Sequence, residues 1–208
     1  MRLTPAEQLT IKTYNSNAVA WAKKHSTPAY WAEEMAIFKK LLPKGKILEI
    51  GAGGGRDAQE LIKLGYDYVG IDVAEKLLAE AKKLNPTATF LHQTIYDLDF
   101  SKNSFDGFWT SATLLHIPKS RIKTALGKIH TVIKSGGIGF ISIKQGKGEK
   151  IEQDEPQLPG DRRRLFAYYS QDEFRKILED NSYQVIESHI KPISERTTWL
   201  IYFVKASK

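Results

Sequence analysis

The stretch from Lys46 to Asp57, KILEIGAGGGRD, constrains the fold more than any other part of the chain. The run from Ile47 to Ile50 has the length and β-branched content of a buried strand, and the glycines that follow are typical of its end. A helix that begins near Arg56 would present free backbone N–H groups in its first turn. Glycines also let a ligand lie against the main chain. The sequence therefore predicts a strand, a ligand-binding loop and a helix, in that order.

Short apolar segments and amphipathic segments alternate after this loop. The expected strands are 47–51, 66–72, 87–92, 105–110 and 138–144, and the expected helices are 55–64, 74–85 and 118–134. This alternation predicts an α/β fold with a mostly parallel sheet and helices on both faces. A last helix at 170–181 precedes two strands, 183–190 and 197–205, which we expect to form an antiparallel hairpin at one sheet edge. The polar segment 145–169 is expected to be a long loop.

Two helices are expected before the first strand. Thr4 as N-cap, Pro5 at the first helical position and Glu7 closing a capping box predict the first helix. The second is expected from about residue 27 to residue 42. We predict that residues 1–44 form a helical lid over an α/β core of residues 45–208, and that the 208 residues make one domain.

Composition excludes several kinds of chemistry. The chain has no cysteine, which excludes disulfides, thiolate catalysis and cysteine metal ligands. The histidines are not spaced as metal ligands, so no metal is predicted. No apolar run reaches the roughly 20 residues that a membrane span needs, and no signal peptide is visible, so a cytoplasmic chain with no membrane contact is expected.

The formal net charge of +7 raises the question of nucleic acid. Lysines are spread along most of the expected helices among acidic residues, and only Arg162 to Arg164 form a compact cluster. The charge therefore fits a solvated basic surface or a surface that receives an anionic substrate. Oligomeric state stays open between monomer and homodimer.

The glycine loop fits one of two cofactor classes better than the other. In the dinucleotide fingerprint G-x-G-x-x-G, the spacing from Gly51 and Gly53 places Arg56 where the third glycine belongs. Asp57 would also lie beside a pyrophosphate, where its negative charge is unfavourable. The alternative pattern, acidic-x-G-x-G-x-G, is complete in Glu49, Gly51, Gly53 and Gly55.

A ligand with a sulfonium and an ammonium, and without phosphate, would find Glu49 and Asp57 complementary. S-adenosylmethionine fits that description. Asp72 ends the second expected strand about 20 residues after the first glycine, where a carboxylate can accept both ribose hydroxyls.

These segments resemble the class I S-adenosylmethionine-dependent methyltransferases, in particular small bacterial methyltransferase-domain proteins. The resemblance covers nearly the whole chain and rests on ILEIGAGGGRDA, YVGIDVAEKLLAEAKK, SFDGFWTSATLLHIP and IKSGGIGFISIK. It implies a Rossmann-like seven-stranded, mostly parallel sheet with an antiparallel C-terminal hairpin.

The resemblance also implies roles for cofactor-site residues. Gly51, Ala52, Gly53 and Gly55 would approach the methionine part, Asp72 the ribose and Val73 the adenine. Similar sequences place an Asp after the third strand to contact the adenine amino group; Thr94, followed by Ile95, stands here, so this contact is altered. Asp97 is either a substitute or a turn residue. Thr110 and Ser111, at the end of the fourth strand, complete the predicted cofactor site.

Two residues are candidates for catalysis. His116, on the loop after the fourth strand, has a side chain that titrates near neutral pH and could accept a proton, or it could simply pack near the helix that follows Pro118. Tyr14 resembles a tyrosine that reaches the cofactor's carboxylate end in similar enzymes, or it packs in the core. Methyl transfer needs a base only if the acceptor is protonated, since the leaving group is already activated.

Candidate substrate residues lie on the expected loop before the last helix. Arg163, Arg164, Tyr168 and Tyr169 could bind an acidic or aromatic substrate, or form a solvated loop. Lys144 and Trp199 are weaker candidates, because each also fits a strand position.

The sequence favours transfer of a methyl group from S-adenosylmethionine to a small-molecule acceptor by in-line displacement. One alternative is an NAD(P)-dependent oxidoreductase. Another is a nucleic-acid methyltransferase acting on RNA, which the basic charge favours and the lack of an added recognition domain disfavours. The chain lacks an Asn/Asp-Pro-Pro-Tyr motif after the fourth strand, which argues against the amino-methylating enzymes that use it.

Overall fold

A computed structural model describes residues 1–208. Its helices are α1 (Pro5–Ser16), α2 (Ala18–Lys24), α3 (Ala32–Leu41), α4 (Arg56–Lys63), α5 (Glu75–Leu84), α6 (Ile122–Val132) and α7 (Gln171–Asp180). Its strands are β1 (Lys46–Ile50), β2 (Asp67–Asp72), β3 (Thr89–His92), β4 (Phe105–Ser111), β5 (Ile133–Lys144), β6 (Glu149–Gln153), β7 (Arg163–Ala167), β8 (Tyr183–Ser194) and β9 (Thr197–Ala206). Two short 3-10 turns, Leu114–His116 and Lys119–Arg121, connect β4 to α6.

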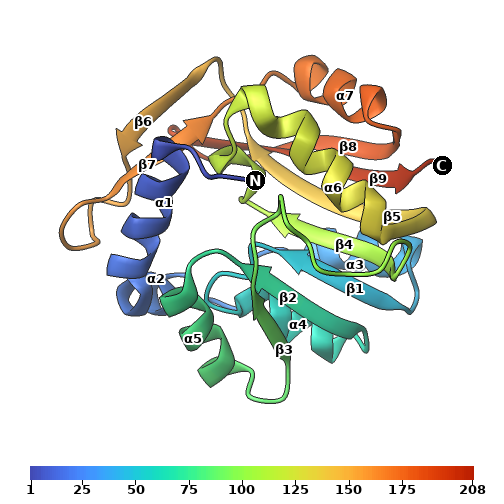
Figure 1. Cartoon of the computed structure of the whole chain (residues 1–208), viewed down its shortest axis with the longest axis horizontal. Helices are drawn as coiled ribbons and strands as arrows, with labels where there is room; N and C mark the ends of the chain where they lie inside the picture. Colours follow the sequence, from blue (N-terminus) through green and yellow to red (C-terminus); the bar gives the residue numbers. More distant parts are fainter.

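Seven of the strands form one sheet in the order β3-β2-β1-β4-β5-β9-β8 (Figure 1). The first five are parallel, whereas β9 pairs antiparallel with β5 and β8 pairs antiparallel with β9. The predicted α/β fold and its C-terminal hairpin are confirmed. Strand order reverses between β1 and β4, and in such sheets this reversal opens a crevice at the carboxyl ends of the strands.

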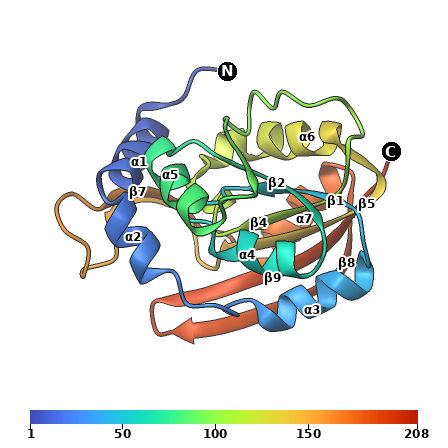
Figure 2. The ribbon, with the colours of Figure 1, turned by 90° about the horizontal axis from the view of Figure 1, so that it is seen from below.

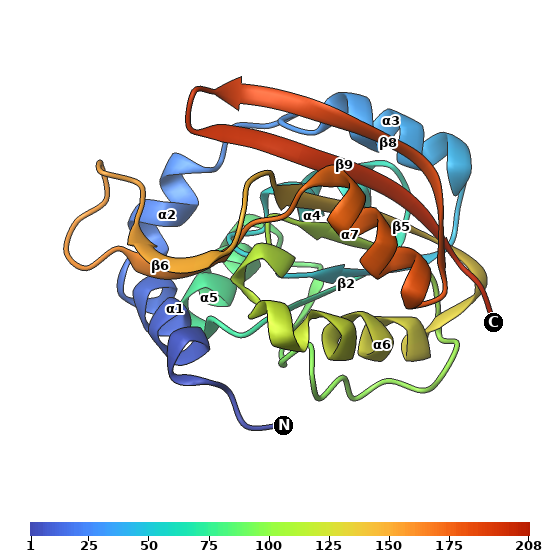
Figure 3. The ribbon, with the colours of Figure 1, turned by 90° about the horizontal axis from the view of Figure 1, so that it is seen from above.

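Helices cover both faces of the sheet, as the alternating sequence predicts. Viewed from above, α3 and α6 lie on opposite sides of it (Figure 3). One apolar core joins the sheet to α6 and α7 through side chains such as Leu126, Ile129 and Phe174. The other core joins it to α3, α4 and α5, with Phe38 and Leu61 fully buried.

The N-terminal segment has three helices where two were expected. The expected capping box is present, because Thr4 Oγ1 accepts from the Glu7 N–H and the Glu7 carboxylate accepts from the Thr4 N–H. The first helix ends at Ser16 and α2 starts at Ala18, with a turn at Asn17 between them. The third helix begins at Ala32 rather than near residue 27, since residues 28–31 form turns.

A buried ion pair fixes the start of α1. The Glu7 side chain is 4% exposed, and its carboxylate accepts hydrogen bonds from Arg121 and, at 2.5 Å, from the Tyr96 hydroxyl. Arg121 also packs its guanidinium over the Tyr96 ring, 4.2 Å from the centroid. Charged groups are buried stably only when they are paired and hydrogen-bonded in this way.

Two further predictions are wrong in detail. The segment 145–169, expected as a loop, contains an antiparallel hairpin of β6 and β7, with Ile151 paired to Leu165. The helix expected over 118–134 starts with a 3-10 turn and ends at Val132, and β5 begins at Ile133 with a register irregularity opposite Phe105 to Gly107. The hairpin matters for the site, because it lies beside α1 (Figures 1 and 3).

None of the helices combines the length and the apolar character that crossing a membrane would require.

Candidate functional site

A cavity of about 520 Å³ lies at the carboxyl ends of β1, β2, β4 and β5. Its lining includes residues at the ends of these strands: Gly51, directly after β1, and Asp72, Ser111 and Lys144, the last residues of β2, β4 and β5. Seen from below, α1 and α2 lie at one end of the sheet, past the ends of these strands (Figure 2). The cavity therefore occupies the crevice that the reversal of strand order creates.

The glycine loop between β1 and α4 forms part of the cavity floor. Gly51 has a φ of 78°, and a Cβ added there would lie 2.0 Å from Oγ1 of Thr113. The N–H groups of Gly51 and Ala52 both donate to the carbonyl of Ile71, each at 2.9 Å, which ties the loop to the end of β2. Gly53 and Ala52 also line the cavity. The bare main chain is thus held open to a ligand.

Asp72 connects the loop to the start of α5. Its Oδ2 accepts from the Gly53 N–H at 2.9 Å, and its Oδ1 accepts from the Ala74 N–H at 2.8 Å. Burial raises the pKa of the Asp72 carboxyl, and the two N–H donors oppose that rise. Each carboxylate oxygen keeps a further lone pair, so Asp72 can still accept hydroxyl groups from a ligand.

Glu49 and Asp57 bring two more carboxyl groups to the same end of the cavity. Glu49 is 2% exposed and accepts a hydrogen bond from the Tyr68 hydroxyl. Burial first, and then the neighbouring charge of Asp57, raise the pKa of Glu49 well above its usual value. Asp57 is held by Arg56 Nε at 2.7 Å and Trp109 Nε1 at 3.0 Å. A cationic ligand group would relieve this repulsion.

The three residues predicted for the adenine end are brought together, whereas two other predicted cofactor residues, Gly55 and Thr110, do not line the cavity. Val73, Thr94 and Ile95 line the cavity. Asp97 does not, because its carboxylate is exposed and accepts from the N-terminal ammonium at 2.6 Å. Gly55 faces α5 and Thr110 is buried in the sheet, and neither lines the cavity.

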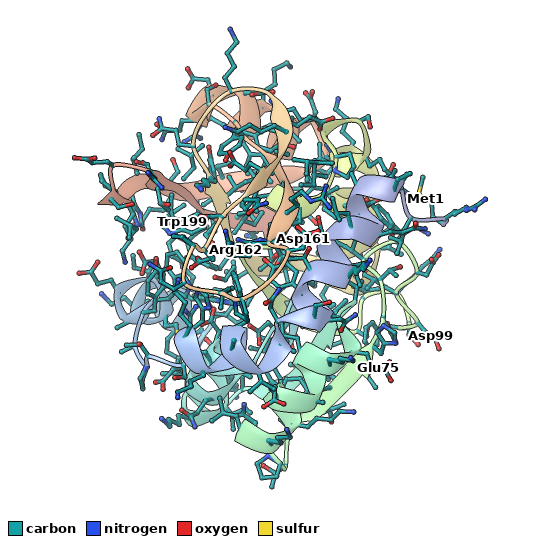
Figure 4. The ribbon with its side chains drawn as sticks, turned by 90° about the vertical axis from the view of Figure 1, so that its left-hand side faces the viewer. Met1, Glu75, Asp99, Asp161, Arg162 and Trp199 are labelled. Carbon is teal, nitrogen blue, oxygen red and sulfur yellow. The ribbon has the colours of Figure 1, made fainter.

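Helices α1 and α2 and the β6–β7 hairpin close the cavity on one side. Thr13 Oγ1 donates to the Arg163 carbonyl at 2.7 Å, and Asn17 Nδ2 donates to the Asp161 carbonyl at 3.2 Å. Lys24 of α2 forms an ion pair with Glu155 in the hairpin connection. Figure 4 shows α1 beside the hairpin connection that carries the labelled Asp161 and Arg162.

Tyr14 and His116 meet in this cavity wall. The Tyr14 hydroxyl lies 2.7 Å from His116 Nε2 and accepts from Arg164 Nη1 at 2.8 Å. His116 Nδ1 lies 2.6 Å from the Leu165 carbonyl, which can only accept, so Nδ1 carries the proton. Nε2 of a neutral ring is then an acceptor for Tyr14. Burial and the nearby Arg164 lower the pKa of His116 to about 3, so the ring is neutral at pH 7.

Two cations lie at the end of the cavity beyond the glycine loop. Arg164, on β7, is 3% exposed, and Lys144, the last residue of β5, is 8% exposed. Asp154 Oδ2 lies 3.5 Å from Arg164 Nη2 and 3.8 Å from Lys144 Nζ. The two cations therefore share one carboxylate, which is half-exposed.

The structure separates the four residues predicted for substrate. Arg164 lines the cavity, whereas Arg163 points to solvent and pairs with Asp161 at 2.8 Å. Tyr168 donates to Glu152, and Tyr169 is buried against Phe174 with ring centroids 5.0 Å apart. Neither tyrosine lines the cavity.

Several cavity residues have no clear signal in the sequence. Trp21 and Phe166 pack around the Arg164 guanidinium, 4.7 and 5.0 Å from its carbon. Trp199, a weak candidate from the sequence, lines the cavity and donates from Nε1 to the Tyr30 hydroxyl at 3.1 Å. These side chains come from distant elements, and only the folded chain brings them together.

The known proteins that this chain is similar to are methyltransferases. Residues 47–137 match a family model described as a methyltransferase domain. An uncharacterized methyltransferase from Synechocystis is 33% identical over 96 residues, which are 46% of this chain and 45% of that protein. The chain thus spans about half the length of this curated relative.

Two crystal structures share the fold. One is a 1,6-didemethyltoxoflavin-N1-methyltransferase from Burkholderia thailandensis with bound 1,6-didemethyltoxoflavin and S-adenosylhomocysteine, with a TM-score of 0.79, 18% identity and coverage of 100% of this chain and 93% of that chain. The other is a methyltransferase from Methanosarcina mazei described as SAM-dependent, with a TM-score of 0.74, 18% identity and coverage of 82% and 97%. These matches confirm the resemblance to the class I S-adenosylmethionine-dependent methyltransferases.

Proposed function

We propose that this chain transfers a methyl group from S-adenosylmethionine to a small-molecule acceptor by in-line displacement. The observation that carries the proposal is the set of three carboxyl groups, Glu49, Asp57 and Asp72, around the glycine loop of a cavity at the carboxyl edge of the sheet. The methyltransferase-domain match over residues 47–137 supports it independently.

The donor set fits this cofactor better than a dinucleotide. Asp72 is placed to accept the ribose hydroxyls, while Val73, Thr94 and Ile95 would surround the adenine. Glu49 and Asp57 favour a cation and disfavour a diphosphate.

When bound, S-adenosylmethionine supplies a methyl group on a positively charged sulfur, which leaves as a neutral thioether. The protein then has to exclude water and to hold the acceptor atom in line with the bond between the sulfur and the methyl group. Helices α1 and α2 and the β6–β7 hairpin would exclude water. The cavity volume of about 520 Å³ lies in the range of small-ligand sites, which favours a small acceptor over a nucleic-acid strand.

His116 and Tyr14 have a narrower role than the sequence suggests. Nε2 of His116 already accepts from Tyr14, and its low pKa makes it a weak base. We infer that the two residues shape the acceptor end and fix Arg164. An acceptor that must lose a strongly held proton fits this site poorly.

Isothermal titration calorimetry with S-adenosylhomocysteine and with NADH tests the proposal. We expect micromolar or tighter binding of S-adenosylhomocysteine and no binding of NADH. Binding of NADH alone would refute the proposal. Incubation of metabolite extracts with cofactor that carries an isotopically labelled methyl group then reports the acceptor directly.

A further inference from the structure

We propose that the methyl acceptor binds as an anion, with its acidic group held between Lys144 and Arg164 and its apolar part against the apolar side chains that line the cavity. This inference rests on the proposed function, because it assigns the acceptor end of the same cavity. It predicts a carboxylic acid with an apolar body.

Lys144 is the first observation behind the proposal. Its side chain is 10% exposed, yet its ammonium makes no hydrogen bond with another group of the protein. The nearest carboxylate oxygen, Asp154 Oδ2, lies at 3.8 Å, beyond hydrogen-bond distance. Its other close neighbours are the Phe166 and Tyr168 rings, 5.1 and 5.7 Å from Nζ to the centroids. The ammonium therefore faces the cavity without a hydrogen-bond acceptor, and a bound anion would supply one.

Arg164 is the second observation. Nη1 donates to the Tyr14 hydroxyl at 2.8 Å, while Nη2 has only Asp154 at 3.5 Å. The guanidinium is packed by Trp21 and Phe166, so its orientation is fixed without consuming all of its donors. A planar guanidinium with free donors is the group that best binds a carboxylate.

The other charged groups nearby do not neutralise these two cations. Glu155 is taken by Lys24 and His25, which lower its pKa to about 2, with the His25 hydrogen bond as the largest cause. Glu152 pairs with Lys150 at 2.8 Å and accepts from Tyr168. His116 is neutral. Lys144 helps to lower the pKa of Glu152, but the hydrogen bonds of that carboxylate go to Lys150 and Tyr168, and Asp154 is the carboxylate that lies within 4 Å of both Lys144 and Arg164.

The charged groups of the cavity fall into two sets. Glu49, Asp57 and Asp72, with Arg56, lie at the glycine loop, whereas Lys144 and Arg164 come from β5 and β7 and share Asp154. An ionised acceptor suits the second set. It also needs little help from a base, which agrees with the weakly basic His116.

The first experiment measures acceptor charge preference. Protein saturated with S-adenosylhomocysteine is titrated with 2-naphthoate and with its neutral analogue 2-naphthamide. We expect the acid to bind about tenfold or more tightly than the amide. Lys144→Met should abolish this preference, with Lys144→Gln as a second variant if Met is not tolerated. Lys128→Met, an exposed lysine on α6, makes the same charge change and should leave the preference intact. Equal affinity of acid and amide for the wild type would overturn the proposal.

The second experiment separates the acceptor's acid from the cofactor's own carboxylate. S-adenosylhomocysteine and its decarboxylated analogue are titrated into the wild type and Lys144→Met. We expect the affinity ratio of the two compounds to be the same in both proteins. If Lys144→Met binds the two compounds with more nearly equal affinity than the wild type does, then the Lys144 ammonium holds the carboxylate of the cofactor. That result would also overturn the proposal. Failure of S-adenosylhomocysteine to bind the wild type at all would instead refute the proposed function.

Discussion

The Tyr14 hydroxyl lies 2.7 Å from Nε2 of His116, 102 positions away in the chain. This hydrogen bond joins α1 to the loop after β4, and Arg164 of the hairpin donates to the same hydroxyl. Three elements of the cavity wall therefore meet at one oxygen atom. The shared oxygen atom gives the first prediction.

Tyr14→Phe and His116→Asn should be energetically coupled. Each substitution should cost about 1–2 kcal/mol of unfolding free energy, because each leaves a polar partner without its hydrogen bond. The double variant should cost less than the sum by about 0.5 kcal/mol or more. Urea unfolding measures the cycle. Tyr14→Phe with Tyr183→Phe, a tyrosine that donates to the Leu126 carbonyl elsewhere, should be additive. Additivity in the first pair would show that the Tyr14–His116 hydrogen bond contributes nothing.

His116 should make stability fall on acidification. Its folded pKa of about 3 lies below its ordinary value of 6.5, so the unfolded chain binds the proton first. The stabilisation is present above pH 6.5 and is lost as pH falls from 6.5 toward 3. Between pH 7 and pH 5 the wild type should lose roughly 1 kcal/mol more than His116→Asn, since the ring is partly open to the cavity. Denaturant titrations at both pH values check this, and parallel losses would contradict it.

Asp72→Ala should weaken binding of S-adenosylhomocysteine by about 1–3 kcal/mol, or roughly fivefold to 150-fold. The reason is loss of the ribose acceptor and of the partner for the Gly53 and Ala74 N–H groups. Calorimetry measures the change. Asp67→Ala, at the exposed start of the same strand, is the matched control and should bind normally. Unchanged affinity of Asp72→Ala would remove this carboxylate from the site.

Gly54→Ala should displace α2. A Cβ at position 54 would lie 2.9 Å from the Cβ of Ala22, and the backbone of α2 is close behind it. We expect a stability loss of about 1–3 kcal/mol and faster hydrogen exchange over residues 18–24. Gly127→Ala, where an added Cβ meets nothing within 4 Å, should stabilise α6 slightly. Undisturbed exchange in α2 would show that the lid does not rest on the glycine loop.

Glu155→Gln should loosen the closure of the cavity. It removes the carboxylate that pairs with Lys24 and His25 between α2 and the hairpin connection. Dissociation of S-adenosylhomocysteine should be about two- to fivefold faster, as expected for a partly exposed ion pair. Stopped-flow displacement measures the rate. Glu187→Gln on the exposed edge of β8 is the control. Equal dissociation rates in all three proteins would exclude a role for this ion pair.

The sequence was sufficient to predict the sheet and most of the residues that line the glycine-loop end of the cavity. Local signals act there: apolar runs define β1 and β2, glycines define the loop, and Asp72 follows directly from its place at a strand end. The capping box at Thr4 is equally local. Such features depend on neighbours in the chain and can be recognised without the tertiary structure.

The acceptor end could not be predicted in the same way. The β6 strand has one apolar side chain, Ile151, and its partner β7 is held by side chains of α1: Thr10 accepts from the Leu165 N–H at 2.9 Å, and Thr13 donates to the Arg163 carbonyl. These contacts join residues about 150 positions apart. Lys144 fits an ordinary strand end in the sequence, and only the fold shows that its ammonium lacks an acceptor.

The ion pair of Glu7 with Arg121 limits how ligands can enter and leave. Movement of α1 away from the sheet would break this buried pair and leave the Tyr96 hydroxyl without its acceptor, at a free-energy cost of several kcal/mol. Helix α2 is different, because it has seven residues and only Ala18 is buried. Exchange of product for fresh cofactor can therefore proceed by local opening of α2 and the hairpin connection while α1 stays docked, so turnover need not involve partial unfolding of the domain.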